Sequence, residues 1–314
     1  MKAAIVQGAG QVPVYGDFDE PVAAAGEYRI KVTASAVSHL AKNRAAGTHY
    51  SSSGRFPFVV GIDGAGRLDD GRRVYFLMPR APHGSMAEYT VVPARNCIAL
   101  PDALDDVTAA AIANPGMSSW AALMERARLK AGETVLVNGA TGTSGRLAVR
   151  IARHLGAGRV IATGRRAEVL ETLGADATIP LIEDQDALEQ RFKEQFAEGV
   201  DVVLDYLWGS SAACLLRAGA KAGADAVPIR FVQIGAMGGA ELALPAAVLR
   251  SSAIELMGSG IGSVPFERML KCIGDLLQAA VPAGFEVAAT PVPLAQFERA
   301  WASDDGTRRT VFTV

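Results

Sequence analysis

The sequence predicts an α/β protein of two domains, an irregular β-barrel and a doubly wound parallel sheet. The chain of 314 residues is long enough for two cores, and half of its residues are hydrophobic. Residues 120–262 alternate short apolar runs with helical patterns, which is typical of a parallel sheet with right-handed crossovers. Residues 1–119 instead contain short β-rich runs that Gly, Pro and Asp interrupt, as in an irregular barrel.

The composition argues for a cytoplasmic enzyme. A net charge of −2 gives no reason to expect a nucleic-acid or membrane-surface partner. No apolar run approaches the roughly 20 residues that span a bilayer, and the N-terminus lacks the apolar core and cleavage site of a signal peptide. Three widely spaced cysteines form neither a disulfide framework nor a CxxC metal site.

The two ends of the chain are expected to form one domain. Its first part contains the β-rich runs MKAAIVQ, YRIKVTASAV, RRVYFL and AEYTVVP. The C-terminal part contains two helical patterns, PFERMLKCIGDLLQA and VAATPVPLAQFERAWA, and then a closing strand, RRTVFTV. Because that part is too short to fold alone, we expect residues 263–314 to complete the domain of residues 1–119.

A glycine-rich turn lies near the start of the second domain. The run ETVLVNG predicts a buried strand, and three glycines follow it at a spacing of three: Gly139, Gly142 and Gly145. A helical apolar face then continues as far as Gly156. Strand, turn and helix are the parts of a Rossmann-type unit, whose backbone amides and helix N-terminus bind a pyrophosphate. The spacing departs from G-x-G-x-x-G, so a purely structural turn remains an alternative.

The next strand indicates which nucleotide is bound. The run RVIAT is followed by Gly164, Arg165 and Arg166, and Arg165 lies 20 residues after Gly145. An NAD-binding fold places an acidic residue there, on the ribose 2′-hydroxyl. An acid would repel a 2′-phosphate, whereas a guanidinium can bind it bidentately. We therefore expect NADPH as the cofactor, with a solvated loop as the alternative interpretation of the two arginines.

Two other nucleotide-binding motifs fit less well. The phosphate loop of ATPases needs Gly-Lys-Ser/Thr, whereas this chain has Gly145-Arg146-Leu147. Short-chain dehydrogenases have this kind of turn at the N-terminus and use Tyr-x-x-x-Lys, but none of the six tyrosines has a lysine four residues later.

The rest of the second domain continues the alternation. Helices are expected at 168–174 and in the runs DALEQRFKEQF and SSAACLLRAGAKAG, and strands at DATIPL, 200–206 and 229–235. Residues 253–258, AIELMG, would form the outermost strand. An apolar edge with little charge favours pairing with another chain.

The chain as a whole resembles the medium-chain dehydrogenase/reductase superfamily. Five stretches look like family stretches, in the family's order: KVTASAVSHLAKNRAAG, FPFVVGIDGAG, DGRRVYFL, GSMAEYTVVP and ANPGMSSWAAL. The resemblance implies a GroES-like catalytic domain at 1–119 and 263–314, and a Rossmann-type NADP-binding domain at 120–262. It also implies a homodimer in which the outermost strands pair across a two-fold axis.

The positions that hold catalytic zinc in the family's alcohol dehydrogenases carry other residues here. In place of Cys, His and Cys stand Ser38, Ile62 and Asn114, and these cannot form a tight zinc site. The four-cysteine structural zinc lobe is also absent from the sequence, so we expect no metal. Without a Lewis acid the oxidation of a simple alcohol is difficult. The chain therefore resembles most the zinc-lacking quinone oxidoreductases and enone reductases.

The resemblance assigns roles to particular residues. Candidates for orienting the substrate and stabilising an oxyanion are Ser38, His39, Asn43 and Asn114. Asn43 stands where quinone oxidoreductases often carry a tyrosine, which leaves the proton donor open. Ser118 is expected at the nicotinamide ring and Arg309 at the pyrophosphate. The full cofactor-binding set is Ser118, Gly139, Ala140, Thr141, Gly142, Thr143, Ser144, Gly145, Gly164, Arg165, Arg166, Ile234, Gly235, Ala236, Met237, Gly258, Ser259, Gly260 and Arg309.

Some of these assignments have plainer alternatives. His39 could be a loop histidine whose hydrogen bonds are satisfied, Asn114 a turn former before proline, and Arg309 a surface charge.

The expected function is hydride transfer from NADPH to a quinone or an α,β-unsaturated carbonyl compound, without zinc. The loop 47–56, GTHYSSSGRF, is expected to shape the pocket for this small-molecule substrate. Two alternatives remain: an NADPH-dependent aldehyde or ketone reductase, and a non-catalytic NADPH-binding redox sensor.

Overall fold

The computed structural model describes residues 1–48, 54–182, 184–303 and 308–314, which fold into two compact units. Unit 1 comprises Met1–Asn114 and Ile273–Val314, and unit 2 comprises Pro115–Cys272. The sequence placed the boundaries at 119/120 and 262/263, which differs from this division. Both observed boundaries fall inside helices, α2 (Asp106–Ala121) and α8 (Phe266–Ala280). A continuous helix shows no break in sequence pattern where it passes from one unit to the other.

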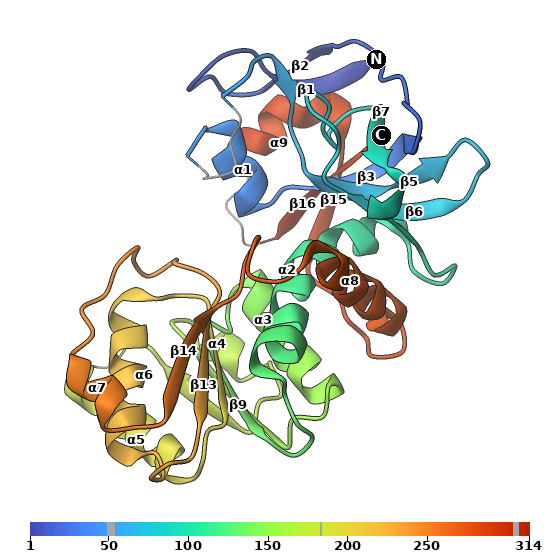
Figure 1. Ribbon diagram of the computed structural model, residues 1–314. Helices are drawn as coiled ribbons and strands as arrows, with labels where there is room; N and C mark the ends of the chain where they lie inside the picture. Colours follow the sequence, from blue (N-terminus) through green and yellow to red (C-terminus); the bar gives the residue numbers. More distant parts are fainter. Residues whose placement is uncertain (49–53, 183, 304–307) are drawn as a thin grey trace. The chain divides into compact units, whose positions relative to one another are not determined.

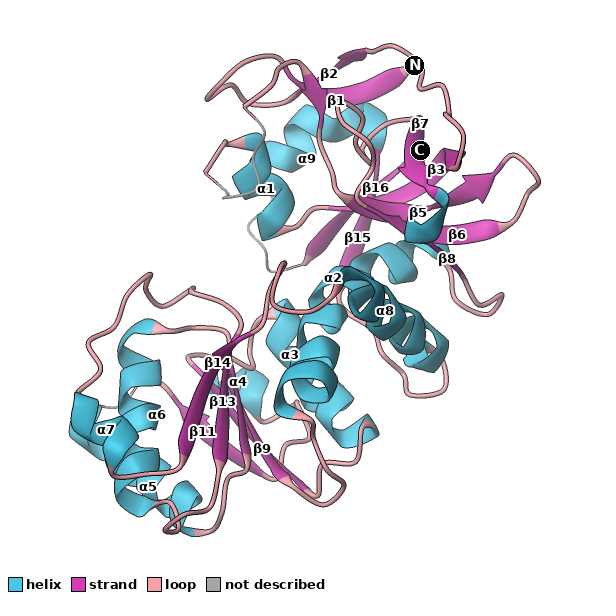
Figure 2. Ribbon diagram, in the orientation of Figure 1, coloured by secondary structure: helices cyan, strands magenta, loops and turns pink. Residues whose placement is uncertain are grey.

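Unit 1 is built on two β-sheets (Figure 2). The smaller has the order β2-β1-β4 and consists of β1 (Lys2–Val6), β2 (Val14–Asp17) and β4 (Phe58–Val59). The larger has the order β15-β16-β3-β5-β6-β8, with β7 also paired to β3. Its strands are β3 (Glu27–Ala36), β5 (Asp63–Leu68), β6 (Arg73–Leu77), β7 (Tyr89–Pro93), β8 (Cys97–Ala99), β15 (Ala289–Pro293) and β16 (Arg309–Thr313).

The C-terminal segment is part of the larger sheet of unit 1. Strand β16 pairs antiparallel with β3 and parallel with β15. Phe312 on β16 packs against Phe297 of α9 (Phe297–Ser303), with ring centroids 4.9 Å apart. Helix α1 (His39–Ala45) packs on the same cluster through Ala41.

One sequence-based expectation in this unit is wrong. The run VAATPVPLAQFERAWA, expected to be a single helix, forms strand β15, a 3-10 turn at Leu294–Gln296 and helix α9. Pro291 and Pro293 lack the N–H that a helix interior requires. Strand β15 lies at the edge of its sheet, a position that tolerates proline.

Unit 2 contains a six-stranded parallel sheet, which confirms the doubly wound fold. Its order is β11-β10-β9-β12-β13-β14, and β14 (Ile254–Gly258) is an outermost strand, as expected. The other strands are β9 (Thr134–Asn138), β10 (Arg159–Gly164), β11 (Ala177–Pro180), β12 (Val202–Asp205) and β13 (Ile229–Gln233).

Helices cover both faces of this sheet (Figure 1). Helix α3 (Thr143–His154) lies on one face, and α5 (Gln185–Ala197) and α6 (Gly209–Ala222) lie on the other. The shorter helical segments are Ala122–Ala127 (a π-helix), α4 (Ala167–Leu170) and α7 (Ala246–Arg250). The helix expected at 168–174 thus ends at Leu170, and the chain turns before Gly174, whose φ is +66°.

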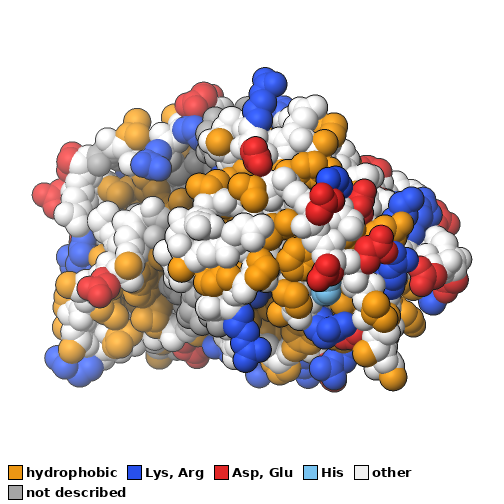
Figure 3. Space-filling model, turned by 90° about the horizontal axis from the view of Figure 1, so that it is seen from above, with side chains coloured by type: hydrophobic (Ala, Val, Ile, Leu, Met, Phe, Trp, Pro, Cys, Tyr) orange, Lys and Arg blue, Asp and Glu red, His pale blue; other side chains and the backbone are white. Residues whose placement is uncertain are grey.

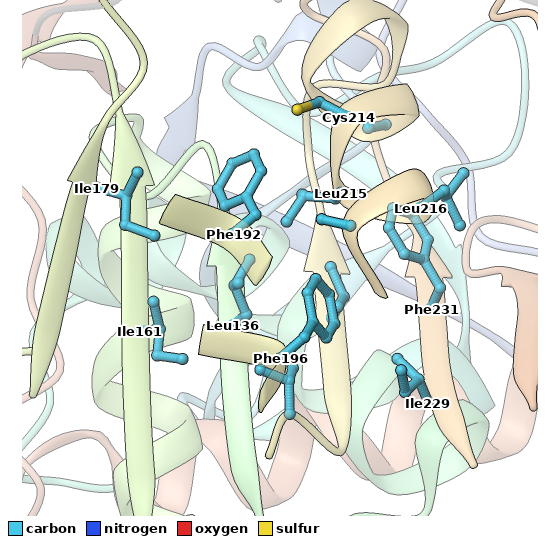
Figure 4. Packing of buried hydrophobic residues seen from close by; sticks show 14 of the residues in the cluster. Leu136, Ile161, Ile179, Phe192, Phe196, Cys214, Leu215, Leu216, Ile229 and Phe231 are labelled. Atoms are coloured by element: carbon cyan, nitrogen blue, oxygen red, sulfur yellow. The ribbon is translucent and has the colours of Figure 1, made fainter. Parts of the chain in front are cut away.

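The core of unit 2 joins the sheet to α5 and α6 (Figure 4). Phe192 and Phe196 of α5 and Leu215 of α6 pack over Leu136 and Ile161 of the central strands, and all five side chains are buried. This packing holds β9, β10 and β12 in fixed register, so the loops at their carboxyl ends are anchored on a rigid sheet.

The surface carries charges of both signs. Figure 3 shows Lys and Arg side chains interspersed with Asp and Glu on the visible face, in keeping with the net charge of −2. Among the described residues, no helix has both the length and the apolar character needed to cross a membrane.

Candidate functional site

The candidate cofactor site of unit 2 lies at the carboxyl ends of its strands. Strands β9 and β12 are neighbours, but the chain leaves β9 for β10 on one side and leaves β12 for β13 on the other. The helices that follow them, α3 and α6, lie on opposite faces of the sheet (Figure 1). This reversal is the topological switch point of the sheet, which is where open α/β sheets bind their ligands.

The glycine turn between β9 and α3 is tightly packed. Gly139 has φ +93°, which favours glycine. A Cβ on Gly145 would lie 2.3 Å from the carbonyl oxygen of Gly139, so only glycine allows α3 to approach the strand this closely. Gly142 caps α3 without a side-chain hydrogen bond. The amides of the first turn, from Thr143 to Gly145, therefore face outward as a cradle for a phosphate group.

A buried network of hydrogen-bonded polar side chains links the ends of three adjacent strands. Thr163 Oγ1 on β10 donates to Asn138 Oδ1 on β9 at 2.7 Å, and Asn138 Nδ2 donates to Asp205 Oδ1 on β12 at 2.8 Å. The backbone N–H groups of Leu207 and Trp208 also donate to this carboxylate. Burial raises the pKa of Asp205, and these donors oppose the shift. The sequence signal for this polar network is a polar residue at or next to the last position of each of these buried strands.

Three arginines lie around the turn, one more than expected. Arg166 Nη2 and Arg146 Nε both donate to the carbonyl oxygen of Thr141. Burial lowers the pKa of Arg146, and the nearby charge of Arg166 lowers it further. Arg165 is exposed beside them. Two guanidinium groups on one neutral carbonyl oxygen create an excess of positive charge that suits a phosphate dianion.

Arg146 does not belong to the expected cofactor-binding set, because in the sequence it stands out only as the residue in place of the lysine of an ATPase phosphate loop. The structure places it beside Arg166 because Gly164, at the end of β10, lies against Thr141: a Cβ on Gly164 would be 2.4 Å from Thr141 Cγ2.

Ser118 contacts a buried tyrosine within unit 2. Its Oγ donates to the carbonyl oxygen of Pro115 at 2.6 Å and lies 3.2 Å from Tyr206 Oη, just beyond the end of β12. Burial raises the pKa of Tyr206 to about 12, with the hydroxyls of Ser118 and Ser119 opposing. The phenol therefore keeps its proton at neutral pH.

Two segments of the expected cofactor-binding set lie at the carboxyl ends of β13 and β14. The N–H groups of Ile234 and Gly235 both donate to the carbonyl oxygen of Asp205, at 2.7 and 3.1 Å. Ala236, Met237, Gly258 and Gly260 are exposed, and Ser259 continues the ladder through its N–H to Gln233. The carbonyl oxygen of Gly235 accepts from Gln233 Nε2 at 3.0 Å. Contacts with a ligand are therefore left to the carbonyl group of Ile234 and to the exposed positions.

In unit 1, the catalytic candidates lie on two helices. Ser38 is buried and caps α1, accepting from the Ala41 N–H at 3.0 Å, which leaves its own hydroxyl proton available for donation. His39 and Asn43 are exposed on α1. Asn114 is half-buried inside α2, so its interpretation as a turn former is wrong. No hydrogen bond joins these four residues to one another within the described part of the chain.

A buried carboxyl group, missed at the sequence level, follows Ile62. Tyr75 Oη donates to Asp63 Oδ2 at 2.7 Å, and Ser35 Oγ donates to the backbone carbonyl of Asp63 at 3.2 Å. Burial raises the pKa of Asp63 to about 6, although the phenol and the charge of Arg309 both lower it. The Nε and Nη2 atoms of Arg309 are buried. This residue therefore acts on Asp63 within unit 1, and its expected role at the pyrophosphate stays a prediction.

Unit 1 also contains a cavity of about 420 Å³ between α1, β4 and the loop at 79–83. Gly47, Gly54 and Phe56 line it, which agrees with a pocket shaped by the loop 47–56; residues 49–53 of that loop lie outside the described residues. Its other lining residues are Ala9, Gly10, Ala41, Arg44, Ala46, Phe58, Val59, Val60, Gly61, Ile62, Pro79, Ala81, Pro82 and His83.

Comparison with known proteins relates the whole chain to oxidoreductases. Residues 145–279 match the family model described as zinc-binding dehydrogenase. The probable NADPH-dependent quinone reductase tdiC of Emericella nidulans is 30% identical over 93% of this chain and 94% of its own length. The 2-haloacrylate reductase of a Burkholderia species is 32% identical over 57% of this chain and 58% of its own.

Among solved structures, the quinone oxidoreductase from Thermus thermophilus, which was also solved as a complex with NADPH, matches over the full length of both chains. The TM-score is 0.82 and the sequence identity 28%.

Proposed function

This chain belongs to the medium-chain dehydrogenase/reductase superfamily, in its quinone oxidoreductase-like branch, and we propose that it reduces quinones or C=C bonds conjugated to a carbonyl group. It is an NADP-dependent oxidoreductase. The observation that carries the proposal is the group of three arginines at a phosphate-binding turn, because this arrangement suits NADPH rather than NADH.

The residues of unit 2 fit the cofactor. When bound, NADPH supplies a hydride from its nicotinamide ring. The turn at 139–145 and the first turn of α3 would hold the pyrophosphate, while Arg146, Arg165 and Arg166 would hold the 2′-phosphate. Ser118, held by Tyr206 and Pro115, would lie against the nicotinamide.

The residues of unit 1 favour an acceptor that is already activated. Ser38, Ile62 and Asn114 stand at the positions of the family's zinc ligands, and a hydroxyl, an alkyl group and an amide are not zinc ligands. Ser38 and Asn114 can donate hydrogen bonds to an oxyanion, which stabilises charge as it develops, but they cannot replace a Lewis acid. A quinone or an enone needs only this help, because conjugation already spreads the incoming charge. Two relatives are named for reducing substrates of this type, a quinone and a 2-haloacrylate.

A panel of acceptors tests the proposal. NADPH oxidation by the purified protein should be fast with a naphthoquinone or a conjugated enone and slow with a saturated aldehyde of the same size. Preference for the saturated aldehyde would favour a carbonyl reductase. Tight NADPH binding without turnover of any acceptor would favour a redox sensor.

We also propose that two copies pair through β14. This strand is at the sheet edge, and Leu256 on it is 39% exposed. An apolar edge strand of this kind is stabilised by pairing with its two-fold mate.

A further inference from the structure

We propose that the cavity of unit 1 binds an organic monoanion with a flat, unsaturated body, such as a conjugated or aromatic carboxylate. Its volume of about 420 Å³ lies within the range of small-molecule sites. The assignment of this anion as the substrate rests on the proposed function, whereas its binding does not.

Part of the cavity wall is apolar and is held by the core. Ala41 and Val60 are buried members of the cluster that also contains Phe297 and Phe312, and Phe58 packs against it. The rings of Phe56 and Phe58, both lining the cavity, lie with centroids 5.6 Å apart and planes tilted by 39°. Such walls bury flat apolar groups well and lose little entropy on binding, because they are already ordered.

Arg44 supplies the charge that selects an anion. It lies in the last turn of α1, lines the cavity and is half-buried. Burial lowers its pKa, so the guanidinium has lost part of its hydration. Elsewhere in unit 1, the largely buried Arg73 pairs with Asp106, but in the described part of the chain no carboxylate pairs with Arg44. A ligand carboxylate would replace the lost hydration with a bidentate pair.

The charge balance favours a monoanion. The phosphate-binding region of unit 2 brings two guanidinium groups to one carbonyl oxygen, whereas among the described lining residues of this cavity only Arg44 is a permanent cation. His83 also lines the cavity, but burial lowers its pKa, so it adds no charge at neutral pH. The guanidinium group of one arginine pairs with one carboxylate group through two parallel hydrogen bonds.

The decisive measurement is calorimetric titration of the full-length protein with trans-cinnamate and with the neutral trans-cinnamamide, which has nearly the same shape. The acid should bind at least about tenfold more tightly than the amide, because only the acid forms a charge-assisted pair. Arg44→Gln should abolish this preference. Lys42→Gln removes the same charge from the same helix at a position that does not line the cavity, and should preserve the preference.

A second variant tests the location without altering the charge. Ala46 is exposed and lines the cavity, so Ala46→Phe should weaken the binding of acid and amide alike. The proposal is overturned if wild type binds neither compound, if it binds both equally, or if Arg44→Gln leaves the preference intact. These titrations need no turnover. A protein that reduces no quinone or enone but discriminates the two ligands through Arg44 would therefore refute the proposed function and leave this inference standing.

Discussion

At the scale of single residues, the proposed cofactor site depends on how close Arg146 and Arg166 are held. Both donate to the Thr141 carbonyl, and the charge of one lowers the pKa of the other. Placing like charges together costs free energy, and a phosphate dianion offsets that cost. We therefore infer that Arg146 contributes to cofactor choice as much as the two arginines that the sequence indicated.

Arg146→Gln should weaken NADPH binding by about tenfold or more and leave NADH binding nearly unchanged, since only NADPH carries the 2′-phosphate. Arg165→Asp should have a larger effect of the same kind, because it adds repulsion. Fluorescence titration with both cofactors measures this, with Arg150→Gln, exposed on the same helix, as the control. An equal loss of affinity for both cofactors would mean that Arg146 supports the turn and does not contact the 2′-phosphate.

Asp63 should make the stability of the protein depend on pH. Its pKa is about 6 in the folded state and roughly 3.9 in an unfolded chain. Between these values the folded state binds more protons, so its contribution to the free energy of unfolding falls as the pH rises from about 4 to about 6. The fall is on the order of 3 kcal/mol if burial outweighs the charge of Arg309.

Urea unfolding of wild type and Asp63→Asn between pH 4 and 7 tests this. The asparagine does not titrate, so the difference between the two free energies isolates the carboxyl group. That difference, wild type minus variant, should fall with rising pH. If it rises instead, Arg309 keeps Asp63 ionised in the folded state.

At the scale of elements, the order of the parallel strands decides both where a ligand binds and which edge is left unpaired. The same crossover pattern that places the switch point between β9 and β12 leaves β14 outermost. The alternation of apolar strands and helices indicated a doubly wound parallel sheet with right-handed crossovers and placed β14 at its edge, but it did not give the order of the other strands. The sequence did not indicate strand β15, because a segment with two prolines looks unlike an interior strand. The structure has room for these prolines because β15 has a single paired neighbour.

The β14 edge predicts a dimer. The chain mass is 32.8 kDa, and sedimentation at micromolar concentration should give about twice this value. Leu256→Lys places a charge on the edge strand and should shift the mass toward that of one chain. Leu249→Lys, exposed on α7 and not part of the edge strand, should remain dimeric. A dimer that survives Leu256→Lys would place the interface elsewhere.

At the scale of the whole molecule, the chain leaves unit 1 through α2 and returns to it through α8. Unit 1 takes its closing strand, β16, from the C-terminus and pairs it with β3. Folding of unit 1 therefore requires contacts between residues far apart in the sequence, while unit 2 is formed from one continuous segment.

The residues at the family's zinc positions, Ser38, Ile62 and Asn114, predict an enzyme that works without metal. Exhaustive chelation should leave the rate of quinone reduction unchanged, and elemental analysis should find well under one zinc per chain. Stoichiometric zinc together with chelator-sensitive turnover would contradict the proposed mechanism.

The sequence by itself determined the fold class, the glycine turn, two of the three arginines and the loss of zinc ligands. The first three depend on residues close together in the chain, whose periodicity or chemistry can be read directly, whereas the zinc positions Ser38, Ile62 and Asn114 were identified through the resemblance to the superfamily. Only the tertiary structure decided that Arg146 joins Arg166 at Thr141, that Asp63 is buried beside Tyr75 and Arg309, and that Arg44 lines the cavity of unit 1. In these cases the charges around a residue depend on its burial and on side chains that are distant in the sequence. A local sequence pattern does not indicate which distant side chains will be neighbours.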